Sequence, residues 1–180
     1  MKPRSFAIVA LLCQPCAALD MFLELVGTDG RTIQGESLDK TFQSSIDILA
    51  WSWGASNAGT THVSGTGGGK GFFQDLALTK YIDASTTELL KAVSTGARFA
   101  TAKLSVRTAG SVPVTYVVFQ MEDVIASKLS SGGSSGEDRL TENISLNFAK
   151  FRYYYTQRSS TGTALPVKKF GWDIPQSMLW

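Results

Sequence analysis

Residues 139–155, "RLTENISLNFAKFRYYY", alternate between apolar and polar side chains, and this alternation constrains the fold more than any other stretch. The apolar positions of one parity are Leu140, Ile144, Leu146 and Phe148. The polar positions between them are Thr141, Asn143, Ser145 and Asn147. A period of two is typical of a β-strand with one face in the core. The other face then meets water or a polar partner.

Most of the remaining chain shows strand patterns as well. In "SSIDILAWSWG", residues 44–54, both parities carry apolar side chains, so we expect both faces of this strand to be covered. In "TYVVFQMEDVIAS", residues 115–127, one face is predicted to carry Val117, Phe119, Met121 and Ile125. Shorter strands are predicted at residues 22–26, 72–81, 103–107 and 167–174.

One stretch, "DASTTELLKAVSTG" at residues 83–96, predicts a helix. Ser85 and Glu88 have the spacing of a capping box, and Gly96 can supply the left-handed residue that ends a helix. Its apolar stripe is predicted to consist of Leu89, Leu90 and Val93. One short helix among many strands favours an antiparallel β-barrel or sandwich, mainly β in class, with the helix covering a barrel end or facing a ring.

Residues 1–18 stand apart from this pattern. Lys2 and Arg4 precede an apolar run at residues 6–12 and small residues near Ala18, which is the outline of a secretory signal peptide. A start codon assigned upstream of the true one would explain the segment equally well, and the run is too short to span a bilayer. We therefore expect a leader or extension at 1–18 and one domain at 19–180.

The charge composition argues against two classes of partner. Without residues 1–18 the chain carries fifteen basic and fifteen acidic residues, and its one basic doublet is Lys168-Lys169. Nucleic-acid binding depends on clustered cations, and membrane-surface binding depends on a basic amphipathic helix. The sequence shows neither feature, so no nucleic acid and no membrane is expected as a partner.

The glycine-rich stretch "SGTGGGKGFF", residues 64–73, raises the question of phosphate binding. A Walker loop needs Gly where Ser64 stands and Ser or Thr where Gly71 stands, so the template fails at both ends.

Catalytic and metal-binding residues are also lacking. His62, the single histidine, lies in the same loop, and the chain has no nucleophile elbow for a hydrolase. Cys13 and Cys16 both lie in the leader, and the acids form no metal-ligand set. We expect no catalytic residue, no metal and no cofactor.

Several motifs occur in a fixed order along the body of the chain. They include "IDILAWSWG", "GGKGFFQDLALTKYIDAST", "AKLSVRTAG", "GEDRLTENISLNFAK" and "FGWDI". In this order they resemble the Hcp family, the hemolysin-coregulated proteins of bacterial type VI secretion, from about Leu19 to Ile174.

The resemblance implies a β-barrel subunit of two sheets with one helix, which assembles into a six-membered ring without enzyme activity. Rings would stack into the inner tube inside a contractile sheath, capped by a spike protein of the VgrG type. The lumen would carry and stabilise effector proteins. The protein would then lie in the bacterial cytoplasm before firing and be secreted to the medium or a target cell afterwards.

Two candidate sites follow from the resemblance together with the polar strand face. The predicted lumen residues are Ser134 in the "SSGGSSG" loop and, on the strand, Asn143 and Asn147. The predicted ring-stacking residues lie in the long loop at 57–71 and are His62, Gly67, Gly68, Gly69 and Lys70. If residues 1–18 act as a signal peptide, the alternative is a stand-alone secreted binding protein or adhesin of similar barrel build.

Overall fold

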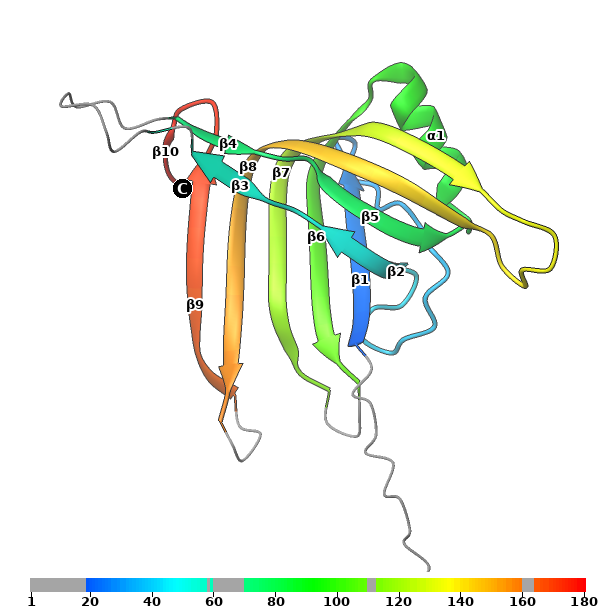
Figure 1. Ribbon diagram of the computed structural model, residues 1–180, viewed down its shortest axis with the longest axis horizontal. Helices are drawn as coiled ribbons and strands as arrows, with labels where there is room; N and C mark the ends of the chain where they lie inside the picture. The colour runs from blue at the N-terminus through cyan, green and yellow to red at the C-terminus, as the bar shows by residue number, and fades with distance from the viewer. Residues whose placement is uncertain (1–18, 58, 60–69, 110–112, 160–163) are drawn as a thin grey trace, which may run out of the picture.

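Ten strands and one helix make up the described part of the computed structural model, which comprises residues 19–57, 59, 70–109, 113–159 and 164–180. Six strands close an antiparallel barrel (Figure 1). They are β1 (Leu19–Gly27), β2 (Ile46–Ser52), β5 (Leu76–Tyr81), β6 (Arg98–Thr108), β7 (Thr115–Gly132) and β8 (Thr141–Arg158). The ring runs β8-β5-β2-β1-β6-β7 and closes because β7 also pairs with β8. The predicted β-barrel with one helix is thus confirmed.

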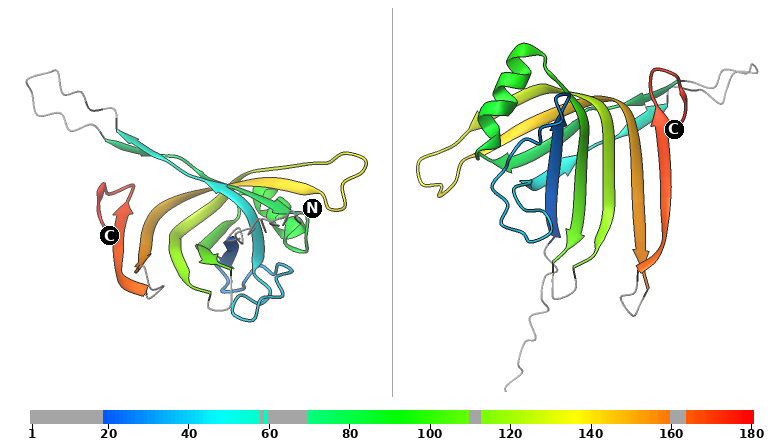
Figure 2. Two further views of the ribbon diagram at one scale, coloured as in Figure 1. Left: turned by 60° about the horizontal axis from the view of Figure 1, so that its bottom comes forward. Right: turned by 180° about the vertical axis from the view of Figure 1, so that it is seen from behind.

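The other strands extend this barrel. β9 (Ala164–Asp173) continues the sheet beside the second half of β8, and β10 (Met178–Leu179) pairs with β9. β3 (Ala55–Asn57) and β4 (Gly71–Phe73) form a separate two-stranded hairpin that projects from the barrel (Figures 1 and 2). The single strand predicted at 72–81 is therefore wrong, because Gln74 and Asp75 separate β4 from β5.

An aromatic cluster fills the barrel. Phe119 and Phe151 are fully buried, and the ring centroid of Phe119 lies 4.8 Å from Trp53, 5.6 Å from Phe148 and 5.7 Å from Phe151. Tilted and edge-on pairs at these distances are the arrangements that aromatic rings prefer. The cluster joins the paired strands β7 and β8 to Trp53, which directly follows β2.

The prediction that both faces of β2 are covered is wrong. Ile46 and Ile48 are buried, whereas Leu49 and the following Ala50 are exposed. The register with β5 shifts between Ile48 and Ala50, so Leu49 is an extra residue in the ladder. Trp51 packs against the core beyond this bulge, and the one-residue insertion explains why both parities are apolar.

The predicted buried face of β7 is confirmed as far as Asp123, where the strand bends. Val117, Phe119 and Met121 are buried as expected, but Ile125 is only half-buried, and Val124 takes its place in the core. Asp123 lies between the two parts with a φ of 54°, and the buried parity changes there. A left-handed residue in a strand bends it locally and turns the following side chains over.

On β8 three of the four predicted core residues, Ile144, Leu146 and Phe148, are buried. The fourth prediction is wrong: Leu140 is 44% exposed and precedes the strand. Glu142 occupies the buried parity instead, and it is completely inaccessible to solvent.

The single helix, α1 (Ser85–Thr95), lies at one end of the barrel and buries Leu89 and Ala92 (Figure 1). Gly96 ends it in the left-handed conformation, with φ of 68°, as predicted. The predicted capping box is wrong, because the Asp83 carboxylate accepts the Ser85 backbone N–H at 2.9 Å. Leu90 was expected in the apolar stripe but is 52% exposed.

Candidate functional site

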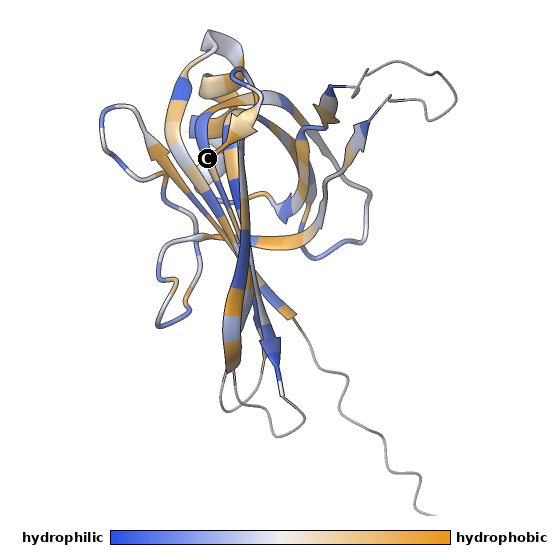
Figure 3. Ribbon diagram, turned by 90° about the vertical axis from the view of Figure 1, so that its left-hand side faces the viewer, coloured by the Kyte–Doolittle hydropathy of each residue, from blue (hydrophilic) through white to orange (hydrophobic). Residues whose placement is uncertain are grey.

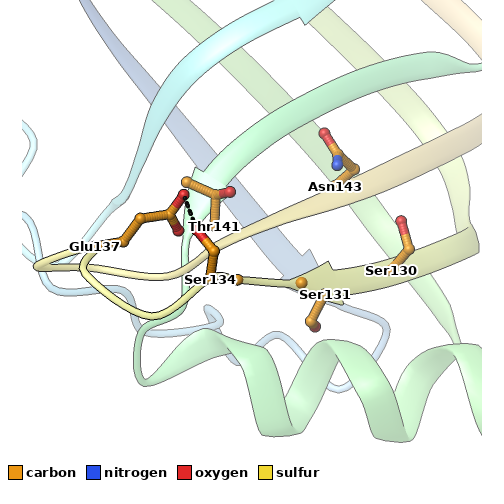
Figure 4. Close-up of a pocket in the computed structure, with 8 residues that line it drawn as sticks. Ser130, Ser131, Ser134, Glu137, Thr141 and Asn143 are labelled. Carbon is orange, nitrogen blue, oxygen red and sulfur yellow. Dashed lines mark hydrogen bonds between the residues drawn. The ribbon is translucent and has the colours of Figure 1, made fainter.

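Two of the predicted lumen residues, Ser134 and Asn143, line the same hollow at the loop end of the β7–β8 hairpin (Figure 4). Its volume is about 420 Å³. Its lining consists of Ser130, Ser131, Gly132, Gly133, Ser134, Glu137, Thr141 and Asn143. The Ser134 hydroxyl donates a hydrogen bond to the Glu137 carboxylate over 3.1 Å. Every lining residue is polar or glycine, so this hollow can exchange hydrogen bonds with polar groups of another molecule.

Asn143 belongs to the outward face of the barrel, as the alternation predicted. The Thr79 hydroxyl of β5 donates to the Asn143 side-chain carbonyl over 2.8 Å. The strand register places Ala50 beside Thr79, and Thr79 beside Asn143. The next row across the three strands is Ser52, Ala77 and Ser145. These two rows on the outward face of β2, β5 and β8 therefore carry small, uncharged side chains, and we call them the small-residue face.

Asn147, the third predicted lumen residue, lies outside the hollow. Its side-chain amide donates to the Asp75 carboxylate over 2.7 Å, and the Ser127 hydroxyl also donates to Asp75. Asn147 is exposed on the same outward parity of β8 as Asn143. The structure thus brings Ser134 and Asn143 together and leaves Asn147 in a separate polar group farther along the strand.

The predicted ring-stacking residues His62, Gly67, Gly68 and Gly69 lie outside the described residues. Lys70 is described; it is exposed and directly precedes β4. β3 and β4 pair in register from Ala55 opposite Phe73 to Asn57 opposite Gly71. This ladder shows that the predicted loop starts and ends on a projecting hairpin (Figure 2).

A buried ionic cluster beside the hollow was missed by the sequence reading. The Lys80 ammonium lies 2.7 Å from the Glu142 carboxylate and 2.8 Å from the Asp83 carboxylate. The Thr86 hydroxyl donates to Glu142 over 2.8 Å, which ties the first turn of α1 to β8. The sequence does contain a signal for this cluster. Lys80 and Glu142 are charged residues at positions where the alternation of their strands places apolar, inward-facing side chains.

A second ionic cluster anchors the connection between β1 and β2, residues 28–45. The Arg107 guanidinium donates to Asp39 and Asp20, and it lies 5.0 Å from the ring centroid of Phe22. These hydrogen bonds lower the pKa of Asp39 from its ordinary value of 3.8 to about 2, with Arg107 as the main cause. The same hydrogen bonds, first to Asp39 and then to Asp20, raise the pKa of Arg107.

Within the described ranges, no three His, Cys, Asp or Glu side chains come close enough to hold a metal ion. No helix in the described part of the chain is long and apolar enough to cross a membrane.

Comparisons with known proteins agree in sequence and in fold. The sequence profile of the family described as "Type VI secretion system effector, Hcp" matches residues 22–155. A relative described as "Protein hcp1", from Pseudomonas aeruginosa strain PAO1, is 46% identical over 165 residues, which is 89% of this chain and 98% of the relative.

Two solved structures share the architecture over nearly their whole length. One, described as "Structure of a type six secretion system protein", has a TM-score of 0.83 at 24% identity and covers 91% of this chain and 100% of its own. The other is Hcp1 from Salmonella typhimurium, with a TM-score of 0.73 at 28% identity over 91% of this chain and 99% of that one. The chain belongs to the Hcp family of type VI secretion proteins, as its motifs predicted.

Proposed function

We propose that this protein is a structural subunit of the inner tube of a type VI secretion system. Six copies form a ring, rings stack into a tube inside the contractile sheath, and a VgrG-type spike protein caps the tube. The protein is made in the bacterial cytoplasm and leaves the cell when the sheath contracts. The observation that carries the proposal, on a chain of this family, is the small-residue face of β2, β5 and β8.

The small-residue face suits the wall of a lumen. Its six central positions are Ala50, Ser52, Ala77, Thr79, Asn143 and Ser145. None of these side chains is long or charged, so a ring with this face toward its axis has a smooth, hydrophilic wall. In a closed ring every copy presents the same face to the axis, which multiplies the area of this wall.

The hollow around Ser134 supplies a place for an effector to make specific hydrogen bonds. It lies at the edge of the small-residue face, because Asn143 belongs to both. A folded effector in the lumen would therefore meet the Ser134 and Glu137 side chains as well as the wall.

The projecting β3–β4 hairpin is the element proposed to meet the next ring. A glycine-rich segment permits the positive φ values and close backbone approach that such a contact needs. Free rings are expected to stack weakly until the spike and sheath add further contacts.

Mass in solution tests the ring. Native mass spectrometry of the purified protein at micromolar concentration should show a species of six copies. A stable monomer under the same conditions would contradict the tube function.

Cargo binding is tested at Ser134. Ser134→Gln fills the hollow and should leave rings intact while removing the extra mass of effectors bound to rings purified from producing cells. Ser134→Ala, which removes only the hydroxyl and fills nothing, is the matched control. Unchanged effector mass in Ser134→Gln rings would sink the assignment of this residue.

The polar strand face is tested by charge. Asn143→Lys and Asn147→Lys each place a long cation on the outward face of β8, and six of them in one ring repel one another. We expect a lower ring content or a loss of bound effector, measured in the same spectra. If neither changes, this part of β8 lines neither the lumen nor a subunit contact.

N-terminal sequencing of the secreted protein separates the tube function from export by a signal peptide. A mature end at Leu19 indicates signal-peptide processing and supports the binding protein or adhesin. An end at or near Met21 supports a later start codon and type VI export.

A further inference from the structure

Positive charge is concentrated at one end of the subunit. Between Asn143 and Asp173 the chain has five basic residues and no acidic one. They are Lys150, Arg152, Arg158, Lys168 and Lys169. All five lie on the second half of β8 or on β9, the outermost long strand of the sheet in Figure 1. Asp173 offsets only Lys150, at 3.1 Å, so this end remains positive.

The same end has an uncovered aromatic face. β9 extends the sheet beyond the closed barrel, on the side that faces the viewer in Figure 3. The register carries the inner parity of β8 onto β9, with Phe151 opposite Trp172 and Tyr153 opposite Phe170. A groove of about 400 Å³ there is lined mainly by aromatic side chains: Trp51, Trp53, Phe73, Phe151, Tyr153 and Phe170. Phe170 is 50% exposed and Tyr155, next to it on the same face, is 42% exposed. Lys168, opposite Tyr155, lies on this face, whereas Lys150, Arg152 and Lys169 lie on the other face of the same two strands. We call the aromatic surface with Lys168 the aromatic-basic face.

At the opposite end, the β1–β2 connection presents an isolated leucine. Leu38 is 96% exposed, but its two neighbours are fixed. The Ser37 backbone pairs with Ser45 and Ser44, with N–H to oxygen distances of 3.1 Å and 2.9 Å. Asp39 is held by Arg107 and accepts the Thr41 N–H at 2.8 Å. Because the backbone on both sides of Leu38 is already held in place, presenting this leucine to a partner costs little backbone entropy.

Acidic residues surround this leucine. Residues 19–49 contain six acidic residues, Asp20, Glu24, Asp29, Glu36, Asp39 and Asp47, and two basic ones, Arg31 and Lys40. Two more basic residues, Lys103 and Arg107, come from β6 and pair with three of the acids. This end therefore keeps a net charge of minus two, opposite in sign to the aromatic-basic face.

We infer that these two ends form one head-to-tail contact, in which the aromatic-basic face of one copy receives Leu38 and the acidic β1–β2 connection of the next copy. The two surfaces lie at opposite sides of the subunit in every view (Figures 1 and 2), as a contact that repeats around a ring requires. Opposite charges favour this contact over one between two basic ends or two acidic ends, which repel each other. The inference rests on the proposed ring and names the surfaces that close it.

Single substitutions at exposed positions test each end without disturbing the core. Leu38→Arg puts a cation opposite the basic end, and Lys168→Glu puts an acid opposite the acidic end. Lys168 is two residues before Phe170 and so shares its face of β9. We expect each variant to raise the protein concentration at which half of the rings dissociate by about tenfold or more, measured by mass photometry and native mass spectrometry.

Two matched controls carry the same changes elsewhere. Lys169→Glu changes the neighbouring residue, whose side chain points to the other face of β9. Leu90→Arg changes a leucine that is 52% exposed on α1. Lys169→Glu lowers the charge of this end without touching the contact, so it should weaken the rings much less than Lys168→Glu does, and Leu90→Arg should leave them unchanged.

The double variant Leu38→Arg/Lys168→Glu tests whether the two ends face each other. Each contact then pairs the introduced arginine of one copy with the introduced glutamate of the next, and ring stability should recover by about tenfold from the weaker single variant. No recovery, or rings of full stability in either single variant, overturns the inference while leaving the ring function intact. A monomeric unsubstituted protein instead overturns the proposed function itself.

Discussion

The Lys80 ammonium lies 2.7 Å from the Glu142 carboxylate, and neither side chain is accessible to solvent. Asp83 is the second acid on the same ammonium, and hydroxyls of Thr86 and Ser131 donate to Glu142. The ions link β5, β8 and the start of α1 at the foot of the loop that carries Ser134. A buried charge is tolerated when its hydrogen bonds are satisfied, and here the partners converge from several elements.

Removing one partner of this pair should be costly. Lys80→Met leaves two carboxylates without their cation in the interior, and we expect the free energy of unfolding to fall by about 3 to 5 kcal/mol. Urea unfolding measures the loss. Lys103→Met is the control, because its partner Glu24 is 2.9 Å away at the surface and such pairs contribute about 0 to 1 kcal/mol. Equal losses in the two variants would contradict this account.

The Asp39 carboxylate should make stability depend on acid. Its pKa is about 2 in the folded protein and ordinarily 3.8, so the folded state binds the proton less readily. The stabilisation is therefore complete above about pH 5 and is lost as the pH falls from about 4 toward 2. We expect the stability difference between the unsubstituted protein and Asp39→Asn to shrink over that range in urea titrations. A difference that stays constant from about pH 6 to about pH 2 would refute the assignment.

Gly96 should resist substitution because of its backbone conformation. Its φ is 68°, where a Cβ atom costs about 1 to 2 kcal/mol, and Gly96→Ala should lower the free energy of unfolding by this amount. Gly132→Ala is the control, since a Cβ at Gly132 meets no atom within 4 Å and its φ is not positive. Thermal unfolding should show a lower midpoint for the first variant alone.

Phe119 should be the most sensitive ring of the aromatic cluster. Phe119→Ala removes a fully buried side chain that contacts the rings of Trp53 and Phe151, and the expected loss is about 3 to 5 kcal/mol. Phe72→Ala removes a ring that is 64% exposed and should change stability by less than about 0.5 kcal/mol. Comparable losses in urea unfolding would show that the cluster is not the centre of the core.

The sequence predicted the class of fold because alternation is a local property. Ile144, Leu146 and Phe148 could be placed in the core from their spacing alone. The failures lie where one backbone residue breaks the period: Leu49 adds a residue to β2, and Asp123 bends β7. Neither residue type announces a bulge or a left-handed conformation, so spacing alone could not locate them.

The candidate site was predictable only in part for a related reason. Asn143 could be assigned to the outward face from alternation, and the hollow beside it depends on a hairpin that brings Ser134 back toward β8. The partner of Asn147 is Asp75, seventy-two residues away in the chain, and no local pattern relates them. The Lys80–Glu142 pair has a separation of sixty-two residues and was missed because each residue was considered within its own strand.

β7 and β8 are each eighteen residues long and pair with each other from one end of the barrel to the other. In mechanical terms, a force directed along these strands loads their ladder of hydrogen bonds in shear, so that many bonds bear it together and none can be unzipped first. A subunit driven forward along that direction would move as a stiff body, and its weakest points would lie at its contacts with other molecules.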